Sequence, residues 1–265
     1  MRVICVKEPG LLTTVQDLGR KGFRQFGMPV CGAVDANCLQ AANILAGNAP
    51  GEAALELTMA GPEVEFGFSS VVGVTGAAMD PRINGRPTPM WQAVAVYPGD
   101  RLQFGWAQSG CRAYLAVAGG IDVPSVMGSK STYIRGGIGG FKGRALVKGD
   151  CLPVGVSFMD PEQVLNRRIP SIHIPKLKSP WTLRVVPGPQ AGYFTADGLH
   201  TFFRITGLPR MPTAWAAALK ARLSGTWPAP TLFPMRSCRG QYRYRGAAVP
   251  SSCWATVTPR AGTPR

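Results

Sequence analysis

The sequence lacks long hydrophobic runs and has little histidine, and each shortage excludes a class of protein. No apolar stretch approaches the roughly 20 residues that a membrane-spanning helix needs, so we expect no membrane association. The amino terminus reads directly into a strand pattern at residues 3–6, without the anatomy of a signal peptide. His173 and His200 have no partner pattern for a catalytic triad or a metal site. These shortages predict a cytoplasmic protein without a metal.

Paired cysteine motifs and a phosphate-binding loop are also missing. The seven cysteines are odd in number and include no C-x-x-C pair, which argues against a disulfide framework and a zinc site. We therefore expect free thiols in a reducing cytoplasm. No G-x-x-x-x-G-K-[ST] sequence occurs, so the residues alone do not support ATP binding by this chain.

Acidic residues are absent from the last part of the chain. Residues 206–265 contain nine Lys or Arg and no Asp or Glu, so residues 1–205 hold 20 basic and all 14 acidic residues. The formal charge is therefore +6 for residues 1–205, against +15 for the whole chain. A basic tail of this kind suggests nucleic-acid binding. We instead interpret the basic tail as the product of a shifted coding frame, for the reason given below. We therefore expect no nucleic-acid partner.

What the first part of the chain does contain is a series of short strands separated by turn residues. One helix is predicted, with Asp35 as its N-cap and Gly47-Asn48 after its end. Many short strands at near-regular spacing predict an antiparallel barrel or sandwich, so the fold class is all-β with a short helix. The later strands are expected at residues 53–58, 63–66, 71–74, 91–96, 101–104, 113–118 and 145–147.

Two polar loops are candidates for the functional site. Ser131, Thr132, Tyr133 and Arg135 bring hydroxyl groups and a cation together just before a glycine-rich segment, a combination that suits an oxyanion or a carboxylate. The alternative is a glycine-rich corner whose hydroxyls satisfy the backbone of the loop. This loop follows the apolar run at residues 113–118, which has the composition of a strand buried on both faces.

The second candidate loop lies near the amino terminus. Gln16, Asp17 and Arg20 offer an amide, a carboxylate and a guanidinium within five residues. The alternative for Asp17 and Arg20 is a local ion pair that stabilises a turn. Asp35 is also a candidate substrate-binding residue, although the helix cap is the favoured interpretation over a catalytic base.

Six motifs in residues 3–203 give the chain a resemblance to a known family. They are T-T-V-Q-D-L-G-R from Thr13, G-A-x-D from Gly32, A-N-x-L-x-G-N from Ala42, L-A-V-A-G-G-I-x-V-P from Leu115, G-S-x-S-T-Y from Gly128 and V-V-P-G-P-Q from Val185. The chain resembles the carboxyltransferase A/B family. This family includes the C subunit of bacterial ATP-dependent 5-oxoprolinase, KipA and the carboxyltransferase domain of urea carboxylase (allophanate hydrolase subunit 2). The resemblance implies a cyclophilin-like β-barrel.

The resemblance implies three alternative functions. The first is cleavage of 5-oxoproline to glutamate, in which ATP is used by a complex with a KipI-like B subunit and an amidohydrolase-like A subunit. The second is biotin-dependent carboxyl transfer, as in urea carboxylase, although a fused biotin domain with its lysine motif is absent from this sequence. The third is a non-catalytic, KipA-like antagonist of a sensor-kinase inhibitor. The substrates of the two enzymes present a carboxylate or carbamoyl oxygen, which suits the Arg and hydroxyl loops.

The tail has the composition of a coding region read out of frame. Residues 211–222, back-translated and read one nucleotide earlier, permit D-A-D-R-M-G-C-R-L-E-G-P, and residues 250–264 permit P-I-V-L-L-G-D-R-H-T-T-G-G-Y-P. Both strings are similar to amino-acid sequences of this family. The hypothesis is a frame change near residues 203–206; the alternative is a genuine basic tail.

This hypothesis sets the predicted domain organisation. We expect a first barrel subdomain at residues 1–158, a linker at 159–180, the start of a second subdomain at 181–205 and an out-of-frame, disordered tail at 206–265. The second barrel is thus incomplete. Because each barrel half is expected to supply polar loops to the site, we expect the chain as written to be inactive.

Overall fold

The computed structural model describes residues 2–157 and 161–176, together with short pieces of the later chain. The chain divides into two compact units, Met1–Ser179 and Pro180–Arg265. In the second unit the described strands form two short antiparallel pairs: β12 (Thr206–Gly207) with β13 (Lys220–Ala221), and β14 (Arg236–Ser237) with β15 (Gly240–Gln241). Most of the predicted start of a second subdomain at residues 181–205 and most of the predicted tail lie outside the described residues. The predicted domain boundaries therefore stay a prediction.

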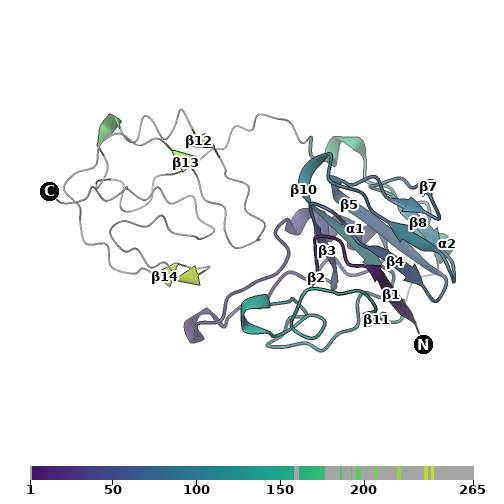
Figure 1. The fold of residues 1–265 in the computed structure, drawn as a ribbon, viewed down its shortest axis with the longest axis horizontal. Helices are drawn as coiled ribbons and strands as arrows, with labels where there is room; N and C mark the ends of the chain where they lie inside the picture. Colours follow the sequence, from purple (N-terminus) through teal and green to yellow (C-terminus); the bar gives the residue numbers. More distant parts are fainter. Residues whose placement is uncertain are drawn as a thin grey trace. The chain divides into compact units, whose positions relative to one another are not determined.

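The first unit is built on two antiparallel sheets (Figure 1). The six-stranded sheet has the order β11-β1-β4-β9-β6-β7, formed by Cys151–Pro153, Val3–Glu8, Glu63–Phe66, Arg101–Gln103, Arg82–Ile83 and Arg86–Pro87. The five-stranded sheet has the order β2-β3-β10-β5-β8, formed by Leu12–Gln16, Ala54–Thr58, Ser109–Val117, Ser70–Ala78 and Ala93–Val96. Both sheets contribute side chains to one continuous apolar core. The all-β fold class predicted from the short strands is confirmed.

Helix α1 (Ala36–Leu45) covers the outer face of the five-stranded sheet. A second apolar cluster there joins the helix to alternate residues of β3 and β10, including Ala54, Tyr114 and Ala116. The intervening residues of β10, such as Leu115, point into the main core instead. Strand β10 is therefore buried on both faces along this part, as its continuous apolar run predicts.

The helix begins where the sequence predicts. The Asp35 side chain accepts a hydrogen bond from the Cys38 backbone N–H at 3.0 Å, which satisfies one of the free donors of the first turn. Gly73 of β5 allows the helix to approach closely, because a Cβ atom there would lie 2.5 Å from the Ala42 carbonyl oxygen. The remaining described helical elements are short: η1 (Arg24–Phe26), η2 (Ile134–Gly136), α2 (Pro161–Val164) and η3 (Ser171–His173).

One predicted strand is wrong. Residues 145–147 form no strand; a turn follows them and β11 begins at Cys151. The Asp150 carboxylate fixes this turn by accepting two hydrogen bonds from Arg144, at 2.6 and 2.8 Å, and one from the Val147 N–H. The guanidinium of Arg144 holds the pKa of Asp150 below its usual value. Leu146 of this apolar run is nevertheless buried in the core, whereas Val147 is exposed.

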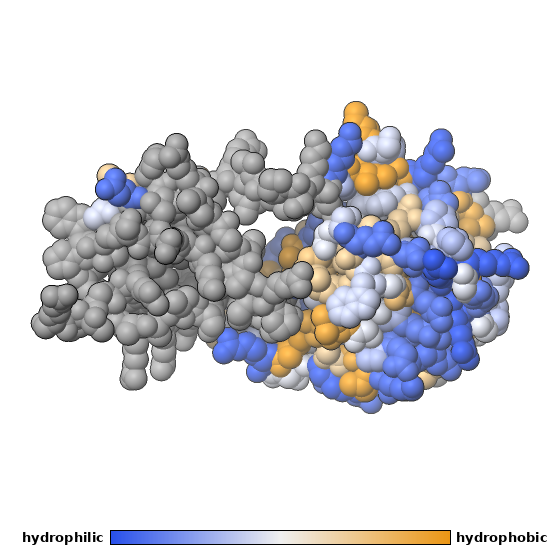
Figure 2. Space-filling model, turned by 45° about the horizontal axis from the view of Figure 1, so that its top comes forward, coloured by the Kyte–Doolittle hydropathy of each residue, from blue (hydrophilic) through white to orange (hydrophobic). Residues whose placement is uncertain are grey.

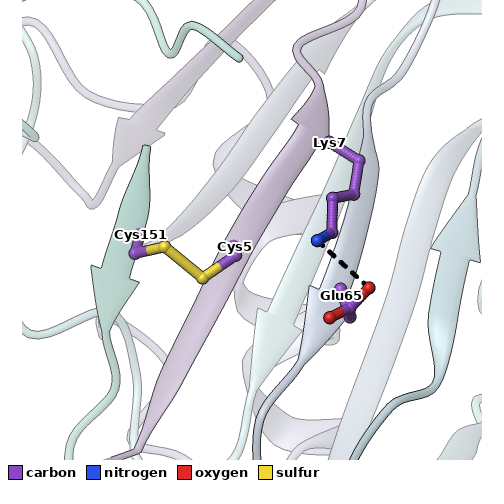
Figure 3. The surroundings of a disulfide bond; sticks show 4 residues. All are labelled: Cys5, Lys7, Glu65 and Cys151. Carbon is purple, nitrogen blue, oxygen red and sulfur yellow. Dashed lines mark ion pairs between the residues drawn. A yellow bond between two sulfur atoms is a disulfide. The ribbon is translucent and has the colours of Figure 1, made fainter. Parts of the chain in front are cut away.

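The structure contains a disulfide that the cysteine pattern argued against. Cys5 of β1 and Cys151 of β11 are register partners in neighbouring strands and are bonded to each other (Figure 3). On the same outward face, Lys7 Nζ lies 3.2 Å from Glu65 Oε2 of strand β4. The prediction was wrong because strand register creates this pair, and a separation of 146 residues gives no local motif.

The face of the first unit seen in Figure 2 mixes hydrophilic areas with smaller hydrophobic ones. Phe26, Trp106 and Ile172 are among the exposed large apolar side chains of the first unit. Among the described residues, no helix is long and apolar enough to cross a membrane.

We predict that replacing both Cys5 and Cys151 by Ser lowers the free energy of unfolding by about 2–5 kcal/mol, because the bond closes a very long loop in the unfolded chain. Urea unfolding under non-reducing conditions measures the difference. The matched control is Cys111→Ser, which removes an exposed free thiol. Equal midpoints for the double variant and the control would contradict the prediction.

Candidate functional site

The two candidate loops lie together at one edge of the five-stranded sheet. Strand β2 is the edge strand, and the later loop hydrogen-bonds to it at Thr132 and Leu146. The Val15 carbonyl oxygen accepts from the backbone N–H and the hydroxyl of Thr132, both at 2.9 Å. The Leu146 N–H donates to the Thr13 carbonyl at 2.9 Å. The polar loop thus covers backbone groups that an edge strand would otherwise leave unpaired.

The Asp17 carboxylate is the centre of this arrangement. Its Oδ1 atom accepts from the Ser129 hydroxyl at 2.7 Å, from the Gly19 N–H at 2.7 Å and from the Ser131 hydroxyl. Its Oδ2 atom accepts from the Lys130 N–H at 2.6 Å. Only 9% of Asp17 is exposed. Four donors around one buried carboxylate join the loop after β2 to the loop after β10.

Arg20 lies beneath the same loop. It is fully buried, and its Nη2 atom donates to the Ser131 carbonyl while Nε donates to the Val126 carbonyl at 3.4 Å. Gly139 is required here, because a Cβ atom at that position would lie 2.6 Å from Arg20 Nη2 and 2.1 Å from the Ser131 oxygen. Within residues 2–157, Asp17 and Arg20 form no ion pair with each other, so the local ion pair offered as an alternative is wrong.

The predicted site residues separate into a buried group and an outer pair. Gln16 and Thr132 are buried beside Asp17 and Arg20, and Gln16 Nε2 donates to the Thr14 hydroxyl at 3.1 Å. Tyr133 is half-buried and Arg135 is exposed, and both lie at the start of the turn η2. Asp35 is the cap of helix α1 and not a member of this cluster of hydrogen bonds.

The loop that leads to helix α1 lies against the buried group. The Arg20 N–H donates to the Val30 carbonyl and the Ala33 N–H donates to the Asp17 carbonyl, both at 2.8 Å. Cys31, in the same loop, has a positive φ of 54°. Burial raises the pKa of the Cys31 thiol, and the Arg20 guanidinium opposes that effect.

Sequence reasoning missed two residues behind this loop, Glu56 and Tyr114. The Glu56 carboxylate accepts from the Val34 N–H at 2.8 Å and from the Tyr114 hydroxyl at 2.9 Å, and both side chains are buried. The available signal was a glutamate inside the apolar strand A-L-E-L-T, because a charged residue in such a place is rarely buried without partners.

The outer surface of the two loops is basic. Residues 18–34 and 126–149 contain eight Lys or Arg and no Asp or Glu; of the eight, Arg20 is buried, and three others pair with carboxylates outside these segments. Lys21, Arg24, Arg135 and Lys142 are exposed. A half-buried tyrosine beside an exposed arginine on a fixed loop can bind a carboxylate or another oxyanion.

We predict that Asp17→Asn lowers the free energy of unfolding by about 2–3 kcal/mol. The amide has one acceptor oxygen, so it leaves backbone donors such as the Lys130 N–H facing its NH₂ group. Urea unfolding measures the loss. Asp122→Asn, which neutralises an exposed carboxylate, is the matched control. A loss no larger than that of the control would show that the network contributes nothing.

Comparisons with known proteins agree with the motifs. A family model described as "Carboxyltransferase domain, subdomain A and B" matches residues 26–206. The C subunit of the 5-oxoprolinase of Escherichia coli (strain K12) is 40% identical over 195 residues, which cover 74% of this chain and 61% of that protein. The urea amidolyase of Lachancea kluyveri is 36% identical over 208 residues, covering 75% of this chain and 11% of that protein.

Solved structures give the same result. The crystal structure of the Kluyveromyces lactis urea carboxylase matches with a TM-score of 0.77 and 31% identity, over 83% of this chain and 21% of that one. The chain spans about three fifths of the length of the 5-oxoprolinase protein and smaller parts of the urea enzymes. The two-sheet fold, the motifs and the family match lead to one conclusion: the chain belongs to the carboxyltransferase A/B family.

Proposed function

We propose that this chain is the C-type component of an ATP-dependent 5-oxoprolinase, which opens the ring of 5-oxoproline to give glutamate. The observation that carries the proposal is the 40% identity to the C subunit of a 5-oxoprolinase over 74% of the chain. The partners are a KipI-like B subunit and an amidohydrolase-like A subunit. The complex uses ATP, and the proposal places no ATP-binding residue on this chain.

The site geometry gives the residues different roles in this proposal. Tyr133 and Arg135 contact the substrate, because they lie on the outer side of the loop and offer a hydroxyl and a guanidinium to its carboxylate. Gln16, Asp17, Arg20, Ser131 and Thr132 are positioning residues, since burial removes them from contact with a substrate. Asp35 acts through helix α1, which it caps.

A second candidate is biotin-dependent carboxyl transfer. The similarity to urea amidolyase and to the urea carboxylase structure favours it. In this alternative the same basic loops bind a carbamoyl or carboxylate oxygen, and the carboxyl group is carried on biotin attached to another domain or protein. The two functions differ in their products, so one set of assays distinguishes them.

We also propose that residues after about 205 are translated out of frame and that the chain as written is inactive. Two observations support this: the shifted reading recovers family-like strings, and the family model matches up to residue 206 and no farther. Loss of groups that position or stabilise charge costs about 10²–10³ in rate for each group.

We predict that the chain as written shows no ATP-dependent glutamate release from 5-oxoproline in the presence of its A and B partners, and that restoring one nucleotide near codon 204 produces activity. In the restored protein, Arg135→Ala raises KM about 10- to 100-fold, because the substrate carboxylate loses a charged partner. Arg86→Ala, which removes an exposed cation of the other sheet, is the control and leaves KM unchanged.

Each alternative has its own outcome in the same assays. Equal glutamate release by both versions would contradict the proposal for the tail. Transfer of the carboxyl group from carboxybiotin to an acceptor such as urea, releasing free biotin and without glutamate release by the restored protein, would replace 5-oxoprolinase with the carboxyltransferase function. Binding to a KipI-like protein without either activity would indicate the KipA-like, non-catalytic function.

A further inference from the structure

Glu56 is a buried carboxyl group whose hydrogen bonds hold a loop outside its own sheet. It lies on β3, directly opposite Thr14 of β2 and Tyr114 of β10. Its Oε2 atom accepts from the Val34 N–H at 2.8 Å and from the Tyr114 hydroxyl at 2.9 Å. The Tyr114 oxygen in turn accepts from the Asp35 N–H at 2.8 Å. Two consecutive backbone donors of the loop thus depend on one carboxyl–phenol pair.

The loop that they hold, residues 30–35, is bound on its other side by the cluster around Asp17 and Arg20. The Arg20 N–H donates to the Val30 carbonyl and the Ala33 N–H donates to the Asp17 carbonyl. Gly19 and Gly32 are in close contact, since a Cβ atom on Gly32 would lie 2.8 Å from the Gly19 nitrogen. The loop is fixed from both sides: by backbone hydrogen bonds on the Asp17 side, and by the Glu56 carboxyl group and the Tyr114 phenol on the other.

The charged groups around Glu56 act in opposite directions. Arg112 of β10 approaches Oε1, with its Nε atom at 3.7 Å, and its side chain is largely buried. The Asp35 carboxylate adds a negative charge from the helix cap. Burial raises the pKa of Glu56, while the Val34 N–H, the Tyr114 hydroxyl and Arg112 oppose the shift, and Asp35 adds to it. Thr14 of the remaining neighbouring strand carries no charge.

We propose that Glu56, acting with Tyr114, is a proton-controlled latch for the loop at residues 30–35. The ionised carboxylate makes charge-assisted hydrogen bonds to Val34 and Tyr114, and such bonds are about twice as strong as neutral ones. A proton on the carboxyl group removes its charge and its attraction to Arg112. Protonation therefore weakens the hydrogen bonds made by the Val34 and Asp35 N–H groups, while the hydrogen bonds on the Asp17 side of the loop remain. The latch is a property of the fold and does not depend on the proposed catalytic activity.

The direction of the pH effect follows from burial. Because the pKa of Glu56 is raised in the folded protein, the loop loosens at a higher pH than an exposed glutamate would allow. The raised value also means that ionised Glu56 opposes folding: its contribution to stability is most favourable below the ordinary glutamate pKa and declines as pH rises through the folded pKa. Local order and global stability thus change in opposite directions with pH.

Hydrogen exchange at the amides of Val34 and Asp35 measures the latch directly in the full chain. We expect their protection factors, corrected for intrinsic exchange, to fall about tenfold as Glu56 is protonated. In Glu56→Gln the amide oxygen can accept both hydrogen bonds, so we expect protection that does not change with pH. The Ala118 N–H, which donates to the Val71 carbonyl at 2.8 Å, is the internal control in both proteins.

A second variant tests the role of the phenol without removing its ring. In Tyr114→Phe, the backbone N–H of Asp35 has lost the Tyr114 hydroxyl oxygen as its acceptor at every pH. Glu56 also loses a donor that lowers its pKa, so protection of Val34 falls at a higher pH than in the wild type. The proposal is overturned if Val34 protection in the wild type is independent of pH, or if Glu56→Gln shows the same pH dependence as the wild type.

Discussion

The candidate site depends on one interaction, the capture of four hydrogen-bond donors by the buried Asp17 carboxylate. Two of these donors are hydroxyls of the loop after β10, and a third is the Lys130 backbone N–H between them. A glycine-rich loop has many accessible conformations, and this carboxylate selects one of them. Arg20 then fixes the Ser131 carbonyl from below. The position of Tyr133 and Arg135, the outer members of the site, follows from these bonds.

The rest of the first unit supplies a rigid base for this network. Strands β3 and β10 are covered by the main core on one side and by helix α1 on the other. That double burial brings Glu56 and Tyr114, two polar side chains, into a place where each must have partners. Their partners are Val34 and Asp35, so the strand core also determines where the loop before the helix lies. The packing of the strand core therefore helps to determine the position of the loop beside the candidate site.

The local features of the chain could be predicted from its sequence, and the long-range ones could not. Asp35 as a helix cap and the double burial of β10 follow from spacing and composition, which act over a few residues. The hydrogen-bond partners that join Asp17 and Arg20 to the loop after β10 could not be predicted, because they lie more than 100 residues away in the sequence. The Cys5–Cys151 bond was missed for the same reason. Glu56 carried a signal, a charge within an apolar strand, but its partner Val34 belongs to a loop without periodicity.

A double-mutant cycle between Asp17 and Ser131 tests the central claim most directly. The unfolding free energies of Asp17→Asn, Ser131→Ala and the double variant give the coupling between the two side chains, separately from any effect on the rest of the fold. The Asp17-centred network predicts a coupling energy of about 1–3 kcal/mol, because each residue loses much of its contribution when the other is absent. Additive losses, with a coupling indistinguishable from zero, would contradict the account.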